Sequence, residues 1–344
     1  GEISGPAGKI QVADTQRDGD LIIHHCVELT GRLAVGMTVT ARVDQKRRDA
    51  IRRAHSATHI LHHALQSVLG HHAQLQGSKV TDDWFRFDFT NMEPVSPEQM
   101  DTIIRIVRSR VQEDSPVQWN TVPLQEARAA GAMMLFGEKY PDPVRMVTMG
   151  DFSRELCGGT HLETTGRVGD FEILSEEGVS AGTRRIVALT GEKARQYNDQ
   201  TRHVLESASQ SLDVSATQVA AGAKHLLQEV RELKKAVSGS GKVPAEWTPQ
   251  SPAVDTSLTD TEVRQSLREM ARLLNVPIFE SPDRLAAMSA ERLALRAQLR
   301  QREEQGTTSV DELLAGAEDS DGVSIVVSEI PLANGNVLRQ LIDQ

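Results

Sequence analysis

The spacing of the apolar residues changes character several times along the chain, and each change predicts a different kind of structure. Up to about residue 45, short apolar runs are separated by glycines, which is typical of short strands in a small β-barrel or meander. From Asp49 to Gly70 apolar residues recur at helical spacing and predict an amphipathic helix of about five turns. Residues 71–190 mix strand-like and helical segments without a regular βαβ alternation. The fold class predicted from these blocks is α+β.

A heptad spacing marks the next part of the chain. Apolar residues there alternate steps of four and three, which predicts a helical coiled-coil arm or a helix that pairs with a neighbouring helix: Val219, Ala223, Leu226, Val230, Leu233 and Val237. A Gly- and Pro-containing linker follows, then two helical patches, a strand at 323–327 and a helix that begins at Asn334. The predicted domains are therefore a small β-barrel (1–45), an α+β domain (46–192), a helical arm (193–237), a linker (238–261) and a helical region with a partial C-terminal domain (262–344).

The charge of the chain bears on its partners. A formal net charge of −10 argues against general affinity for a polyanion, because Lys and Arg supply most non-specific nucleic-acid binding. Basic residues nevertheless gather in two places, Lys46, Arg47, Arg48, Arg52 and Arg53, and the doublet Arg184 and Arg185. Such runs are either a basic patch or ordinary solvated helix faces. The aromatic fraction of 3% makes base-stacking platforms scarce.

The cysteine count and hydropathy suggest a compartment. Two cysteines, Cys26 and Cys157, imply no disulfide framework and favour a reducing environment. No apolar run approaches the ~20 residues of a membrane span. We therefore expect a cytoplasmic protein without a membrane partner.

Two histidines on the predicted helix are candidate metal ligands. His55 and His59 are four residues apart, so they lie on nearly the same side, and the apolar residues of the helix fall on roughly the opposite side. His62 shares their edge and could support them. A pair at this spacing also occurs by chance in histidine-containing helices. Zincin proteases place Glu directly after the first His, whereas Ser56 stands here, so a metallopeptidase is poorly supported.

The run Cys157-Gly-Gly-Thr-His161 supplies two more candidates. Its paired glycines allow a tight turn that brings Cys157 and His161 toward one point. Alone, such a pair could also be a nucleophile with its base, or a buried small side chain. Together with His55 and His59 it makes a plausible tetrahedral Zn²⁺ site with three nitrogens and one sulfur. Four protein ligands describe a closed site, whereas catalytic zinc keeps one position open, and His161 is our candidate for the loosely held ligand.

His55-Ser-Ala-Thr-His59 followed by Cys157-Gly-Gly-Thr-His161 resembles the editing domain shared by alanyl-tRNA synthetases, threonyl-tRNA synthetases and free-standing alanyl-tRNA deacylases. Five further stretches resemble the alanyl branch: Gln76–Ser78, Phe85–Phe89, Leu135–Tyr140, Glu155–Leu156 and Gly178–Ile186. The resemblance covers about residues 8–195, and the heptad arm is similar to that enzyme's helical connector. Nothing in the chain resembles the family's aminoacylation domain, and residues 240–320 match poorly.

The resemblance implies Zn²⁺-dependent hydrolysis of tRNA(Ala) wrongly esterified with serine or glycine. It implies that Gln76 orients water or the ester, and that Thr58 offers its hydroxyl to a serine side chain. The alternatives are a Thr58 hydroxyl that bonds back into its own helix and a Gln76 amide exposed in a loop. The arginines of the two basic groups would contact the tRNA acceptor end. A separate aminoacylation domain or a second copy, bound through the arm, are further expected partners. The alternatives are a free-standing deacylase and a non-catalytic tRNA-binding module with a structural zinc.

Overall fold

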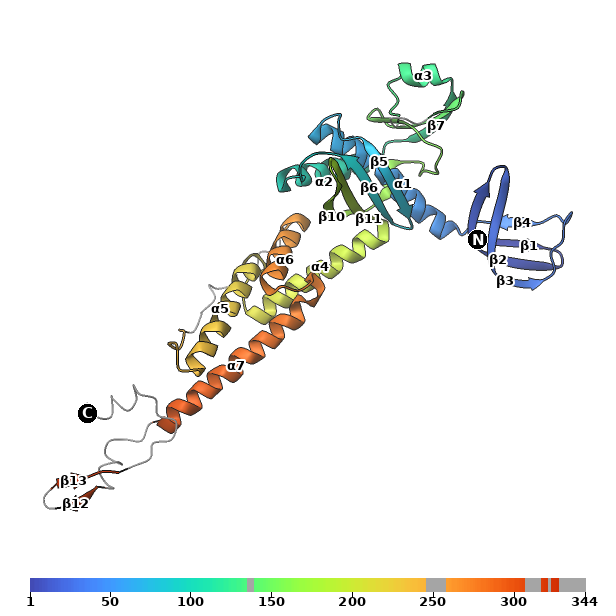
Figure 1. Ribbon diagram of the computed structural model, residues 1–344. Coiled ribbons are helices and arrows are strands. Elements are labelled where there is room, and N and C mark those ends of the chain that lie inside the picture. Colours follow the sequence, from blue (N-terminus) through green and yellow to red (C-terminus); the bar gives the residue numbers. More distant parts are fainter. Residues whose placement is uncertain (135–138, 246–257, 307–316, 321–322, 328–344) are drawn as a thin grey trace. The chain divides into compact units, whose positions relative to one another are not determined.

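The computed structural model describes residues 1–134, 139–245, 258–306, 317–320 and 323–327 (Figure 1). The chain divides into two compact units, residues 1–198 and 199–344. Both contain helices, and the strands of the first unit form antiparallel sheets, so the predicted α+β class is confirmed. Among the described residues, no helix combines the length and apolar character needed to cross a membrane.

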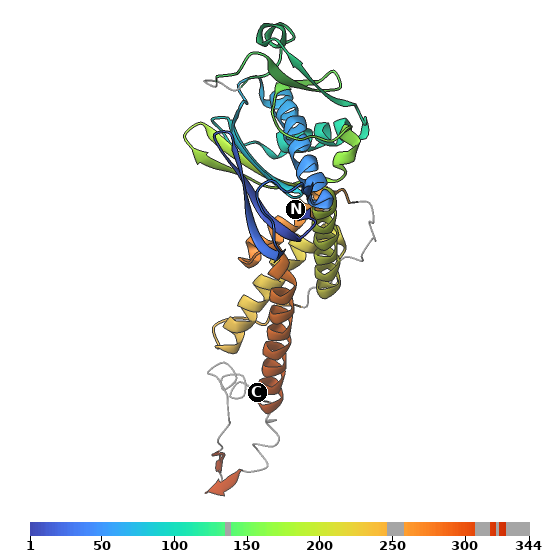
Figure 2. The same cartoon turned by 90° about the vertical axis from the view of Figure 1, so that its right-hand side faces the viewer.

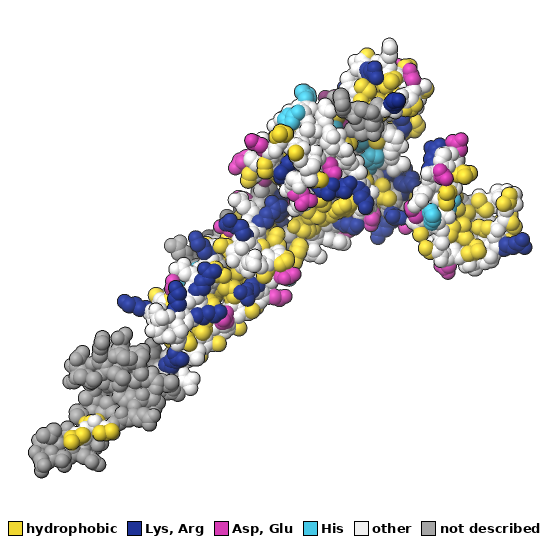
Figure 3. Space-filling model, in the orientation of Figure 1, with side chains coloured by type: hydrophobic (Ala, Val, Ile, Leu, Met, Phe, Trp, Pro, Cys, Tyr) yellow, Lys and Arg dark blue, Asp and Glu magenta, His cyan; other side chains and the backbone are white. Residues whose placement is uncertain are grey.

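The N-terminal strands form an open sheet rather than the predicted closed barrel. They are β1 (Glu2–Gly5), β2 (Gly8–Asp18), β3 (Leu21–Gly31) and β4 (Thr40–Arg42), in the order β3-β2-β1-β4. The barrel does not close because β4 is only three residues long and pairs with β1 alone, which leaves β3 and β4 as separate edges. Four strands are also few for a barrel interior. Apolar side chains on this sheet are exposed, as the face in view in Figure 3 shows.

The helix α1 (Gln45–Leu69) carries the histidine pair. It begins four residues before the predicted Asp49, because the Asp44 side chain accepts a hydrogen bond from the Arg47 backbone and caps the helix. It ends where predicted, at Gly70, whose φ of 111° suits glycine. With α2 (Pro97–Gln112) it packs on one face of an antiparallel sheet. The sheet has the order β10-β11-β6-β5 and consists of β5 (Leu75–Thr81), β6 (Trp84–Thr90), β10 (Phe171–Ser180) and β11 (Thr183–Thr190).

The core of this domain follows the alternation along β6. Phe85, Phe87 and Phe89 are buried, while Trp84, Arg86 and Asp88 between them are not. The phenylalanines belong to the same core as the apolar side of α1, which includes Ile60 and Leu61. The helix is thereby held firmly against the sheet.

A second, smaller sheet leads to the cysteine. Its strands are β7 (Val117–Val122), β8 (Val144–Met149) and β9 (Ser153–Leu156), in the order β7-β8-β9, with α3 (Leu124–Ala129) after β7. The strand β9 ends at the residue before Cys157. The short 3₁₀ helix η1 (Thr165–Val168) then connects to β10. Because η1 contacts α1 and α2, the chain is brought back to the first helix.

The second unit is a set of helices. The helix α4 (Gly191–Leu212) leads into it, followed by η2 (Ala216–Gln218), α5 (Val219–Val237), α6 (Asp260–Leu274), η3 (Ile278–Glu280) and α7 (Ser281–Gly306). The heptad residues Val219 to Val230 pack against apolar residues of α4, α6 and α7 within the same chain. Figure 2 shows the ribbons of these helices from the side. A hairpin of β12 (Glu318–Ser320) and β13 (Val323–Ile325) follows. The helix predicted at Asn334 and half of the predicted linker, residues 246–257, lie outside the described residues.

An ion pair fastens the start of α1 to the sheet. Arg53 Nε and Nη2 donate to the two carboxylate oxygens of Asp83, at 2.7 and 3.1 Å. Asp83 lies in the turn between β5 and β6 and is 6% exposed. Its carbonyl also accepts from the backbone of Thr190. The pair therefore joins α1, the β5–β6 turn and the end of β11.

We expect Arg53→Ala to lower the free energy of unfolding by about 3 kcal/mol, because it leaves the buried Asp83 carboxylate unpaired. Urea unfolding followed by circular dichroism measures this effect. The matched control is Arg47→Ala, an exposed arginine on the same helix, which should change stability by less than ~0.5 kcal/mol. Equal effects of the two substitutions would contradict the structural role of Arg53.

Candidate metal centre

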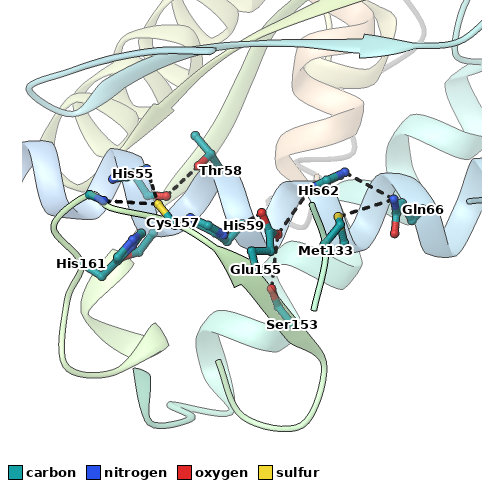
Figure 4. A network of polar contacts seen from close by, with 12 residues as sticks. His55, Thr58, His59, His62, Gln66, Met133, Ser153, Glu155, Cys157 and His161 are labelled. Carbon is teal, nitrogen blue, oxygen red and sulfur yellow. Dashed lines mark hydrogen bonds and ion pairs between the residues drawn. The ribbon is translucent and has the colours of Figure 1, made fainter. Parts of the chain in front are cut away.

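The four predicted ligand side chains meet at one place (Figure 4). His55 and His59 come from α1, and Cys157 and His161 from the loop that follows β9. One ligand atom from each lies within 4.8 Å of the others. The Cys157 sulfur is 3.5 Å from His55 Nε2, and the ring centres of His55 and His161 are 4.3 Å apart. A single ion at the centre of this group can contact all four.

The burial of the helix edge differs from the sequence prediction. This edge was expected to face away from the core, but His59 is 5% exposed and His62 is 2% exposed, while His55 is half-buried. The reason is that β9 packs against this edge of α1, so that the helix is covered on a second side. The site is therefore buried on the His59 side, while His55, Cys157 and His161 remain half-buried.

A glycine allows the loop to approach α1 closely. A Cβ on Gly159 would lie 1.9 Å from His55 Cε1, whereas a Cβ on Gly158 would meet nothing within 4 Å. Ser56, at the position of the protease base, accepts a hydrogen bond from the Leu162 backbone at 3.1 Å and so ties the loop to the helix. The residue that stands in place of the protease glutamate therefore has a structural role, which is to hold the loop.

The loop is also held from its other side. Nη1 of Arg145, on β8, donates to the carbonyl oxygens of Cys157 and Gly159 at 2.7 and 2.8 Å. The backbone N–H of Cys157 donates in turn to the Arg145 carbonyl. These bonds fix the backbone of the Cys-Gly-Gly turn and hence the direction of the thiol.

The electrostatics of the cluster favour a cation. Burial disfavours the thiolate of Cys157, but the neighbouring rings of His161, His55 and His59 stabilise it more strongly and lower its pKa to about 3. Burial, together with the other two histidines, lowers the pKa of His161 to about 4 and keeps that ring neutral. A thiolate and a neutral imidazole are the forms that bind a metal.

Glu155 is the residue that sequence reasoning missed. Its carboxylate lies 2.9 Å from His59 Nδ1 and 3.4 Å from His62 Nδ1. Burial raises the pKa of Glu155, but the charge and hydrogen bond of His59 outweigh burial and lower the pKa below its usual value. The carboxylate therefore stays ionised. Burial lowers the pKa of His59, but the charges and hydrogen bonds of Glu155 and Cys157 more than reverse this and raise it to about 10. A metal ion that binds here therefore displaces a proton from His59. A carboxylate on the second nitrogen of a ligand histidine fixes the ring orientation.

A signal for Glu155 exists in the sequence. Glu155 lies on β9 two residues before Cys157, which directly follows the strand, and in an extended backbone side chains two residues apart point to the same face.

The polar contacts of Glu155 and His62 continue to Gln66, whose amide lies 3.7 Å from the Met133 sulfur (Figure 4).

The donor set fits a metal ion. His161 Nε2 is buried and has no hydrogen-bond partner among the described residues. Such an orphaned nitrogen beside a thiolate requires a ligand, since burying an unsatisfied polar atom is costly. Three imidazoles and one sulfur are a donor set typical of Zn²⁺.

The structure places Thr58 and Gln76 outside the ligand set. The Thr58 hydroxyl donates to the His55 carbonyl at 2.7 Å, back into its own helix. Gln76 lies on β5, at a bulge, and its exposed amide donates to the Thr90 hydroxyl at 3.0 Å. Both roles proposed from sequence therefore remain predictions.

Most of the predicted tRNA-binding arginines are engaged with carboxylates. Arg184 pairs with Glu176 through two bonds, and Arg185 with Asp88, its cross-strand partner, through two more. Arg52 lies 3.4 Å from Asp49, and Arg53 holds Asp83. Arg47 is exposed and Arg48 is half-buried. The net charge near these residues is therefore smaller than their number suggests.

We expect Gly159→Ala to abolish stoichiometric metal uptake, because the added methyl group and the His55 ring would occupy the same space. Gly158→Ala is the control and should bind metal normally. Zinc content of the purified variants and titration with Co²⁺ measure this, and circular dichroism verifies that both variants fold. Normal metal content in Gly159→Ala would show that the loop does not hold its cysteine as described.

Comparisons with known proteins identify the relatives of this sequence. Residues 144–187 match the model of the threonyl and alanyl tRNA synthetase second additional domain. Over its full length the chain is 46% identical to an alanine–tRNA ligase of Rhodopirellula baltica, of which it covers 37%. It is 44% identical over 67% of its length to the ligase of Idiomarina loihiensis, covering 26% of that protein, and 42% identical over 69% to that of Roseiflexus castenholzii, covering 29%. The chain spans about a third of the length of these curated relatives.

Proposed function

The chain is homologous to alanine–tRNA ligases and contains their second additional domain, and on this basis we propose that it hydrolyses tRNA(Ala) esterified with the wrong amino acid. The observation that supports this proposal most strongly is the group of His55, His59, Cys157 and His161. The matched domain supplies two of its members, and the helix α1 supplies the other two.

The metal of the proposal is Zn²⁺. A sulfur among imidazoles favours zinc over magnesium or calcium, which prefer oxygen ligands. Zinc in such a site supplies Lewis acidity, which can activate water or hold the aminoacyl end of the substrate. His161 is the proposed loosely held ligand, since its other ring nitrogen has only a long contact of 3.5 Å with Ser56.

The protein's own residues prepare this chemistry. Glu155 keeps His59 in one orientation, and Arg145 holds the backbone that carries Cys157. Burial excludes bulk water from the inner side of the cluster. In the reaction, water adds to the ester carbonyl, the bond to the terminal ribose oxygen breaks, and the free amino acid and the tRNA 3′-hydroxyl are released.

Discrimination of the amino acid is assigned to Thr58. Its hydrogen is used by the His55 carbonyl, so its oxygen can act only as an acceptor toward a substrate. The hydroxyl of serine can donate to it, whereas the methyl group of alanine cannot. Gln76 would orient the ester or the water with its amide.

The partner of the proposal is the acceptor end of tRNA(Ala). The candidate phosphate contacts are the six arginines named from the sequence: Arg47, Arg48, Arg52 and Arg53 on α1, and Arg184 and Arg185 on β11. An aminoacylation domain or a second copy of the chain are proposed protein partners. Part of the heptad seam is already buried within the chain, so a second copy would use other surfaces of the helices.

The deciding experiment follows release of labelled serine from Ser-tRNA(Ala), with Ala-tRNA(Ala) for comparison. We expect selective release of serine by the zinc-loaded chain, and release at background level by Cys157→Ala. Cys26→Ala is the control, because this second cysteine is exposed and lies on β3, outside the cluster. If the folded, zinc-loaded chain releases no serine, it is a tRNA-binding module with a structural zinc instead.

A further inference from the structure

An exposed tryptophan stands beside the metal loop. Trp119 lies on β7, at the edge of the β7-β8-β9 sheet, and is 59% exposed. Large aromatic side chains normally lose most of their exposure on folding, and this chain has few of them, 3% of its residues. Trp119 therefore presents costly apolar surface to solvent close to the candidate site.

The tryptophan is connected to the site through one residue. The Cζ atom of Arg145 lies 4.7 Å from the Trp119 ring centre, so the guanidinium covers one side of the indole. The same guanidinium holds the carbonyl oxygens of Cys157 and Gly159. Trp119, Arg145 and the cysteine loop thus form a continuous row across the sheet.

Arg145 differs in charge balance from the arginines that hold Asp83, Asp88 and Glu176. Arg53, Arg184 and Arg185 each pair with a carboxylate through two hydrogen bonds. Among the described residues no carboxylate forms an ion pair with Arg145, whose guanidinium contacts two carbonyl oxygens and an aromatic ring. A positive charge without a neighbouring counter-charge attracts an anion, and a guanidinium suits phosphate.

We propose that Trp119 and Arg145 form the subsite for the last, unpaired nucleotide of the RNA substrate. The base stacks on the open side of the indole, and the guanidinium pairs with the phosphate of that nucleotide. Because Arg145 also contacts the cysteine loop, a nucleotide bound there presents its 3′-ester to the metal cluster. This inference rests on the proposed function, of which it names the nucleotide-binding part.

The test measures binding of a substrate that cannot be cleaved. The probe is an acceptor-stem minihelix of tRNA(Ala) that carries serine through a 3′-amide, and a matched probe lacks the terminal base. We expect Trp119→Ala to weaken binding of the intact probe about tenfold, while Trp119→Phe retains most of the affinity. Val179→Ala, which trims another exposed apolar residue of the same unit, should leave the affinity unchanged.

The probe without its terminal base isolates the contact. The wild type should lose affinity for it, and Trp119→Ala should bind both probes equally, because the indole and the base are then two halves of one interaction. Zinc content should equal that of the wild type in all variants. A penalty for the missing base that persists in Trp119→Ala, or loss of zinc from that variant, would overturn the subsite.

Steady-state hydrolysis of Ser-tRNA(Ala) separates this inference from the proposed function. We expect Trp119→Ala to raise KM about tenfold with kcat nearly unchanged, since stacking acts on substrate and transition state alike. If the wild type binds the probe through its terminal base but hydrolyses nothing, the deacylase proposal fails and the subsite stands. If it hydrolyses Ser-tRNA(Ala) with the same KM in both proteins, the subsite fails and the deacylase proposal stands.

Discussion

The close approach of the Cys-Gly-Gly turn to helix α1 is the contact on which the rest of the site depends. It joins residues about a hundred positions apart in the sequence, and it is possible only because Gly159 leaves space for the His55 ring. The bond between Ser56 and Leu162 and the two bonds from Arg145 hold the turn in place. The sheets and helices around it position these two segments, and the sulfur and nitrogen donors converge as a result.

The buried charges around the cluster balance one another. A Zn²⁺ ion, the Cys157 thiolate and the Glu155 carboxylate sum to zero when the imidazoles are neutral, which lowers the cost of burying them together. Further out, arginines are paired with Asp83, Asp88 and Glu176, so the basic doublets stabilise the sheet and the helix. This pairing explains how a chain with a formal charge of −10 can contain local groups of arginines. Arg145 differs from the paired arginines because, among the described residues, no carboxylate forms an ion pair with it.

Much of the fold could be predicted from residue spacing. Periodicity located α1, α5 and the α+β domain, because burial of one side of a helix or strand leaves a repeating pattern. The predicted barrel was wrong, because closure depends on which edge strands pair, and β3 and β4 do not pair with each other. The ligand residues followed from motifs, but the burial of His59 and the role of Glu155 did not. Both depend on β9 covering α1, a long-range contact that local spacing does not encode.

The central claim is that three histidines and one cysteine bind a single zinc ion. X-ray absorption at the zinc edge of the intact, zinc-loaded chain tests it most directly. The account predicts one sulfur at about 2.3 Å together with nitrogen ligands at about 2.0–2.1 Å. A first shell of nitrogen and oxygen without sulfur would contradict it, because Cys157 would then lie outside the coordination sphere.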